Sequence, residues 1–189
     1  MLKMVLFLFV LVGQSHAWAQ LYYLGEGGYL RLNQEAASKN SVYPSGFSYG
    51  GGLGFRKNYF EFETLILKAK AEDDLLHDGV ENKMLHEQTS LLLGLNFYLS
   101  KKFYARFGYG LHKIDQKLKT PVSSASEAGA KKEYNLKEDE LSEGIYFGAG
   151  FLLYNGSKFA LYIQADKYDY ASMNSGAWKG SLGFRYYSD

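Results

Sequence analysis

An acidic run in the middle of the sequence is the first group of residues that could do chemistry. Its carboxylates are Glu72, Asp73, Asp74, Asp78 and Glu81. Carboxylate oxygens are the ligands that Ca²⁺ prefers, so a calcium site is one interpretation, but the spacing does not follow the EF-hand pattern. Charged runs are commonly solvated. We therefore predict a solvated acidic loop, with no metal and no cofactor.

Cysteine chemistry is excluded, because the chain contains no Cys. Disulfides, thiolate catalysis, Cys-ligated zinc and lipoprotein acylation are all ruled out by this absence. The 21 Lys and Arg residues almost balance the 20 Asp and Glu residues, which leaves a net charge of +1. Nucleic-acid binding normally requires a basic excess, so we expect no nucleic-acid partner.

Polar and charged side chains recur at alternate positions of otherwise apolar segments. Alternation of this kind is the pattern of a β-strand and places the polar residues on one face. A charge that faces lipid in mid-membrane costs about 2–4 kcal/mol, so in a membrane barrel this face must point inward. The predicted lumen network consists of Arg56, Glu61, Glu63, Asn96, Arg106, His112, Gln164, Asp166, Lys179 and Arg185.

The alternating segments are about ten residues long, which is the length a tilted strand needs to cross a bilayer. Aromatic residues make up 17% of the chain and favour strands. We predict eight strands, near residues 21–32, 47–55, 59–70, 89–99, 103–115, 145–153, 159–170 and 178–186.

The predicted connections alternate in length. Short ones fall at 57–58, 100–102 and 155–158, long ones fall near 33–45, 71–86 and 116–142, and the last, near 171–176, is shorter than these three. This alternation is typical of outer-membrane barrels, with short periplasmic turns and longer extracellular loops. The fold class predicted is all-β, an eight-stranded antiparallel up-and-down transmembrane β-barrel. Within the third long loop, residues 131–141 are expected to form a short helix or to extend the strands.

Eight strands leave an interior just wide enough for side chains to fill. We therefore predict a plugged lumen with an ion-pair and tyrosine network. The first strand fits this scheme least well, because Glu26 and Arg31 have opposite parity. A β-bulge at Gly27 and Gly28 would let both face inward.

Three lysines interrupt the outward apolar face, namely Lys68, Lys113 and Lys167. We expect all three near the outer membrane interface at similar height. One hypothesis is contact with lipopolysaccharide phosphates. The alternative is that long cationic side chains snorkel to the interface wherever strands leave the membrane.

The N-terminal residues have the features of a secretory signal peptide. Lys3 precedes the apolar run Val5–Val12, and Ala17-Trp18-Ala19 is a small-x-small cleavage site. The run is too short to span a bilayer. We expect cleavage after Ala19, which divides the chain into a signal peptide at 1–19 and a barrel domain at 20–189.

Over residues 21–187 the chain resembles the small eight-stranded outer-membrane barrels of the OmpX and OmpA transmembrane-domain type. Gly180–Tyr187 looks like the C-terminal assembly signal of such barrels, although Ser188 and Asp189 follow it. The resemblance implies a bacterial outer-membrane location and three kinds of partner: membrane lipids, lipopolysaccharide and the barrel-assembly machinery.

Some small barrels are enzymes that modify lipid A, so we tested whether the histidines of this chain fit a catalytic pattern. Deacylase barrels carry a His and a Ser two positions apart on a lipid-facing strand, and neither His86 nor His112 has this neighbour. The inner faces also look too charged for the hydrocarbon pocket of a palmitoyltransferase. We therefore expect no enzyme.

The leading hypothesis is a structural or adhesion-like protein that binds an extracellular partner through loops 71–86 and 116–142. A narrow channel and a soluble periplasmic lipophile-binding barrel are the alternatives.

Overall fold

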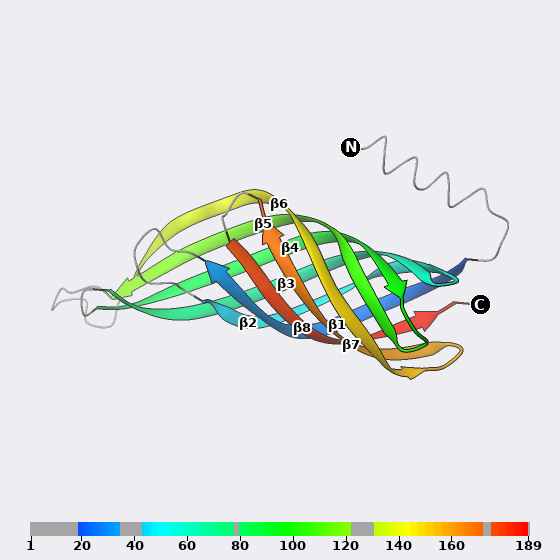
Figure 1. The fold of residues 1–189 in the computed structure, drawn as a ribbon. Helices are drawn as coiled ribbons and strands as arrows, with labels where there is room; N and C mark the ends of the chain where they lie inside the picture. Colours follow the sequence, from blue (N-terminus) through cyan, green and yellow to red (C-terminus); the bar gives the residue numbers. More distant parts are fainter. Residues whose placement is uncertain (1–18, 35–42, 78–79, 122–130, 172–174, 189) are drawn as a thin grey trace.

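The computed structural model describes residues 19–34, 43–77, 80–121, 131–171 and 175–188, and the predicted signal peptide lies outside them except for Ala19. These residues form a closed antiparallel barrel in which every strand pairs with its sequence neighbours and β1 closes on β8 (Figure 1). The strands are β1 (Gln20–Gln34), β2 (Ser45–Lys57), β3 (Phe60–His77), β4 (Val80–Tyr98), β5 (Phe103–Pro121), β6 (Lys131–Asn155), β7 (Phe159–Tyr170) and β8 (Ser175–Tyr187). Within the described part of the chain, no helix is long and apolar enough to cross a membrane.

The pairing register fixes the tilt of the strands. Following paired residues once around the wall from Leu21 of β1 leads back to β1 at Arg31, ten residues further along. A closed barrel with such a stagger must have strands inclined to its axis, by about 35–45° in typical cases. The tilt brings the inward side chains of non-neighbouring strands into contact across the lumen.

The two ends of the barrel differ. At one end, called the turn end here, strands are joined by short connections such as Asn58 and Tyr59, between β2 and β3. Asn58 has a φ of 54°, a left-handed conformation that Asn tolerates better than most residues. At the other end, called the projecting end, β3–β6 extend beyond the remaining strands (Figure 1).

The extensions replace most of two predicted loops. Residues 71–86 were expected to be a loop, yet β3 continues to His77 and β4 begins at Val80. Likewise β5 continues to Pro121 and β6 begins at Lys131, so 131–141 extends a strand and is not a helix. Cross-strand partners of opposite charge stabilise these polar strands. Lys70 pairs with Glu87 in this way, with 3.5 Å between Nζ and Oε1.

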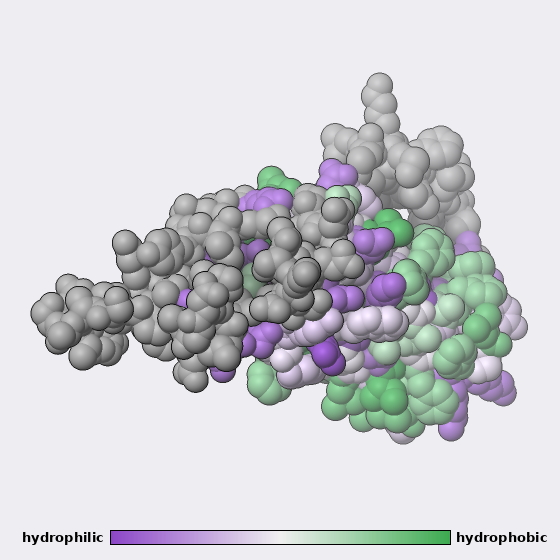
Figure 2. Space-filling view, turned by 60° about the vertical axis from the view of Figure 1, so that its left-hand side comes forward, coloured by the Kyte–Doolittle hydropathy of each residue, from purple (hydrophilic) through white to green (hydrophobic). Residues whose placement is uncertain are grey.

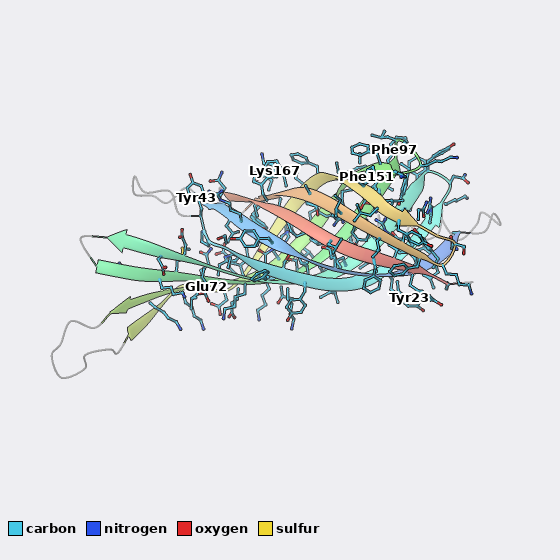
Figure 3. The ribbon with its side chains drawn as sticks, turned by 90° about the horizontal axis from the view of Figure 1, so that it is seen from below. Tyr23, Tyr43, Glu72, Phe97, Phe151 and Lys167 are labelled. Atoms are coloured by element: carbon cyan, nitrogen blue, oxygen red, sulfur yellow. The ribbon has the colours of Figure 1, made fainter. Side chains whose placement is uncertain are left out.

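Side chains alternate between the outer wall and the lumen, with the apolar residues outside as the sequence predicts. On β4, Leu91 and Phe97 are exposed, whereas Ser90 and Asn96 are buried. Figure 2 shows apolar residues gathered over the wall at the end away from the projecting strands. Near the turn end, the side chains of Tyr23, Phe97 and Phe151 point away from the barrel (Figure 3).

The predicted bulge in the first strand is wrong. The register of β1 runs without a shift from Gln20 to Arg31 against β2, and it is also regular against β8. Glu26 therefore faces the lumen, while Arg31 faces outward with its guanidinium 5.0 Å from the ring centroid of Tyr43. An aromatic partner outside the barrel removes the need for an inward turn. Register shifts occur instead in β5–β6 and β6–β7.

Glycines make room for the tyrosines that fill the lumen. Tyr104 lies directly across from Gly150, and a Cβ at Gly150 would be 2.1 Å from its ring. Tyr22 has the same relation to Gly54, with a corresponding distance of 2.2 Å. Only a residue without a side chain lets a ring lie flat against the neighbouring strand, so these glycines are required by close approach.

Candidate functional site

An alternating chain of charges crosses the lumen. Arg106 on β5 links two carboxylates, because it contacts Glu63 of β3 and donates to Asp166 of β7 over 2.9 Å. Beyond Asp166, Lys179 lies 3.6 Å from its carboxylate and also contacts Glu26 of β1. The chain therefore joins strands that are not neighbours in the wall.

On the other side of Glu63 the chain continues to the turn end. Arg185 of β8 lies 3.8 Å from Glu63 and 3.3 Å from Glu61. Arg56 closes the chain, with 3.8 Å between its Nε and Glu61. Four cations thus alternate with four carboxylates, in the order Arg56, Glu61, Arg185, Glu63, Arg106, Asp166, Lys179 and Glu26.

Tyrosine rings cover the cations of this chain. The Arg185 guanidinium lies 4.4 Å from the ring centroid of Tyr162 and 5.0 Å from that of Tyr104. Arg106 has the same relation to Tyr146 at 5.1 Å, and Arg56 to Tyr98 at 4.9 Å. Cation–π contacts of this kind gain strength when they are desolvated. Phenol groups also bind the carboxylates, as Tyr98 does by donating to Glu61 over 2.9 Å.

Burial makes the pairing necessary. The side chains of Arg106, Lys179 and Arg185 have no exposed surface, and Asp166 has none either. Isolated buried charges are very costly, whereas paired and hydrogen-bonded ones are tolerated. The equal number of positive and negative groups leaves no surplus charge among these eight residues.

The residues predicted for the lumen lie as follows. Nine are buried: Glu61, Glu63, Asn96, Arg106, His112, Gln164, Asp166, Lys179 and Arg185. Arg56 is half-buried at the turn end. Asn96 donates to Glu63 over 3.0 Å, and Gln164 donates to Glu26 over 2.8 Å. His112 lies apart from the ion chain, in a second cluster.

This second cluster of polar groups fills the lumen toward the projecting end. Gln88 lies at its centre and makes contacts of 2.9 Å with His112 Nδ1 and 3.2 Å with His86 Nε2. Ser90 contacts His112 over 2.8 Å, and Gln116 contacts the other nitrogen of His86 over 3.0 Å. These groups satisfy one another, so the cluster is a second polar layer across the lumen.

Sequence reasoning expected Glu26 to face inward but left it out of the lumen network, and it missed most of this second cluster. Glu26 has the same parity as Tyr22 and Leu24, and a regular first strand would have placed it inside. His86 was assigned to a loop, although it shares the parity of the inward residues Ser90 and Asn96. The lumen also holds apolar side chains that were not predicted, among them Leu30, Leu32, Leu65 and Leu67.

The predicted acidic loop is a strand hairpin, and two of its carboxylates, Glu72 and Asp73, have partners within the protein. Glu72 is ion-paired with Lys83, and this contact holds the pKa of the Glu72 carboxyl below its ordinary value and raises the pKa of Lys83. Asp73 accepts a hydrogen bond from the backbone N–H of Tyr43 over 2.9 Å. Asp78 lies outside the described residues. The structure, as far as it describes the chain, holds no group of three or more metal-binding side chains.

The three outward lysines do not form one site. Lys68 of β3 and Lys113 of β5 both pair with Thr89 of β4 and are exposed. Lys167 belongs to β7, where its Nζ lies 5.8 Å from the ring centroids of both Phe147 and Trp178. Because β3 and β7 are four strands apart in an eight-stranded barrel, they face opposite directions. Figure 3 shows Glu72, which is also on β3, and Lys167 on opposite sides.

Solved structures share this architecture. Ail, the attachment invasion locus protein of Yersinia pestis, matches with a TM-score of 0.51 at 13% identity, over 90% of this chain and 98% of Ail. Neisserial surface protein A has a TM-score of 0.46 at 14% identity, over 88% of this chain and 96% of its own. The N-terminal barrel domain of Pseudomonas aeruginosa OprF has a TM-score of 0.43 at 13% identity, over 90% of this chain and 100% of that domain. No protein-family model and no curated protein matches the sequence.

The protein therefore has the fold of the small eight-stranded outer-membrane β-barrels. This confirms both the predicted fold class and the predicted resemblance to barrels of the OmpX type.

Proposed function

We propose that the chain is an integral outer-membrane barrel with a closed lumen, which presents its projecting hairpins to the outside in a structural or adhesion-like role. One observation carries the proposal: the charged side chains of the ion chain face the lumen, and the large apolar side chains face outward. Arg106 is 2% exposed, whereas Phe107, the next residue, is 55% exposed. Such a wall is stable in hydrocarbon and unfavourable in water.

A soluble barrel that binds a lipophile would need the opposite arrangement. Its large apolar side chains would fill the interior, whereas this lumen holds the ion chain and its tyrosines alongside leucines such as Leu65. Cell fractionation tests the proposal directly. We expect the protein in the outer-membrane fraction, released by detergent and not by high salt or carbonate. Its migration on a gel should change when the sample is heated before loading. Release without detergent would contradict membrane insertion.

A narrow channel is the competing function for the same fold. The ion chain and the polar cluster lie across the lumen at two levels, and apart from Arg56 at the turn end both are made of buried side chains. We therefore expect no stable open state of porin-like size in planar bilayers. A persistent, ion-selective conductance from the purified wild-type barrel would overturn the closed lumen and favour the channel.

The surface role rests on the hairpins β3–β4 and β5–β6. Loops and extensions on a rigid barrel are the usual place for binding function. The projecting strands carry charges of both signs outside the membrane-spanning part, including Lys70, Glu72, Lys83 and Glu87. The arrangement supports a binding protein better than an enzyme. Ser90 and His112 are in hydrogen-bond contact, but both are 1% exposed inside the barrel.

A further inference from the structure

The outer wall of β3–β5 changes from apolar to charged at one row of residues. On the turn side of this row, the exposed residues paired across the three strands are Ile66, Leu91 and Leu111. On the projecting side, the paired residues are Lys70, Glu87 and Asp115. Between them lie Lys68, Thr89 and Lys113, all exposed and all outward-facing. In a membrane barrel, this row lies at the level of the lipid headgroups.

A groove follows this boundary on the outer wall. It has a volume of about 890 Å³ and is lined by Lys68, Thr89 and Lys113 together with residues of the adjoining rows. Phe47 and Tyr49 of β2 form its other side and are 77% and 65% exposed. Tyr49 pairs directly with Lys68. The groove thus combines cations with exposed aromatic rings. Cations suit an anionic headgroup, and aromatic rings suit the sugar ring that carries it.

The carboxylates of the groove have lysine partners of their own. Glu87 lies 3.5 Å from Lys70, and Asp115 lies 3.7 Å from Lys117. Glu72 is ion-paired with Lys83. The row formed by Lys68, Thr89 and Lys113 itself holds two cations and no carboxylate, so it is the positively charged strip of the groove.

We propose that the row Lys68–Thr89–Lys113 binds a phosphate of lipid A, the phosphorylated glycolipid of the outer leaflet. This inference rests on the proposed membrane insertion. The two lysines are separated by one strand, so their Cα atoms lie about 10 Å apart. Their flexible stems allow both ammonium groups to converge on one phosphate above Thr89. Charge-assisted hydrogen bonds from both lysines and a bond from the Thr89 hydroxyl then hold it. The acyl chains lie over the apolar row of Ile66, Leu91 and Leu111, on the turn side of the site.

Lys113 also interacts within the chain, and this does not prevent phosphate binding, because an ammonium group has three donors. Lys167 does not belong to the site. It lies on the opposite wall from Lys68, over the rings of Phe147 and Trp178, where its long stem carries the charge along apolar surface.

Titration of the mature barrel, refolded in phosphatidylcholine vesicles, with diphosphorylated lipid A tests the site. The variant K68Q/K113Q should bind this lipid about 30-fold more weakly, since each lysine near a charged lipid surface contributes a comparable factor. T89V should bind about 5-fold more weakly through loss of one hydrogen bond. The matched control is K101Q/K102Q, which removes two exposed lysines from the connection between β4 and β5 at the turn end. This control should bind like the wild type.

Two comparison ligands show which part of the lipid the site recognises. Lipid A without its phosphates should bind the wild type and K68Q/K113Q equally, and inorganic phosphate should not displace the intact lipid. Equal binding of diphosphorylated lipid A by K68Q/K113Q and K101Q/K102Q would overturn the site. Heat-dependent gel migration of every variant is recorded separately. A wild-type barrel that fails to insert contradicts the proposed function, whereas inserted variants that bind equally contradict only the site.

Discussion

Arg106 and Asp166 are joined across the lumen by a 2.9 Å hydrogen bond although 60 residues separate them in the sequence. They belong to β5 and β7, which share no pairing in the wall. The bond is therefore a contact through the interior, and with Glu63 on the other side of Arg106 it ties three strands together.

Removal of Arg106 should destabilise the barrel strongly. R106M leaves Glu63 and Asp166 buried without their shared cation, which typically costs about 3–5 kcal/mol. Urea unfolding of the refolded barrel in lipid vesicles measures the change. The control is R31M, because Arg31 faces outward over Tyr43, and its unfolding free energy should change by less than about 0.5 kcal/mol. Equal losses in the two variants would show that the lumen pair does not stabilise the fold.

A methyl group at Gly150 should displace the ring of Tyr104. Because a Cβ there would be 2.1 Å from that ring, we expect G150A to lose about 1–3 kcal/mol of unfolding free energy. G180A is the matched control, since nothing lies within 4 Å of a Cβ at Gly180. In the double variant G150A/Y104A the two effects should be less than additive, because the clash is gone. Additive effects would contradict the proposed close approach.

Acid should loosen the projecting part of β4. His86 lies beyond the row of Lys68 and Lys113, outside the membrane-spanning part, and burial lowers its pKa from 6.5 to about 4. A lowered histidine pKa means that the unfolded form binds the proton first. Stability is therefore complete above pH 6.5 and falls as the pH drops toward 4, by up to about 3 kcal/mol.

Hydrogen exchange around residues 84–88, corrected for the intrinsic pH dependence, measures this opening. The wild type should lose protection between pH 7 and pH 5, and H86Q should lose much less over the same interval, because its side chain does not titrate. A wild-type protection that stays constant over this interval would rule out a buried neutral histidine.

The tip of the β5–β6 hairpin, residues 120–132, should be dispensable for barrel formation. Lys119 and Glu133 are paired across it, so an Asn-Gly turn can replace residues 120–132 without changing the register below. We expect normal insertion and unchanged heat-dependent migration, together with loss of any partner that the hairpin binds. Failure of the shortened chain to insert would show that residues 120–132 belong to the folding unit.

The sequence alone determined the faces of the wall. Alternation is a local property with a period of two residues, so Phe107 had to lie on the opposite side from Arg106 wherever the strand was placed. Strand number and most turns followed in the same way, from apolar alternation and its interruptions. The inward orientation of the polar face also followed, because charge inside and apolar residues outside is the arrangement a membrane permits.

Only the tertiary structure decided which inward groups meet. Closure and stagger are properties of the whole wall, and they bring Arg106 to Asp166 and place Lys68 and Lys167 on opposite sides. They also set the regular register of β1, which includes Glu26 in the ion chain and leaves Arg31 outside. The polar strands of the projecting hairpins carry little apolar alternation. Their extent depends on cross-strand partners such as Lys70 and Glu87, which a single strand does not reveal.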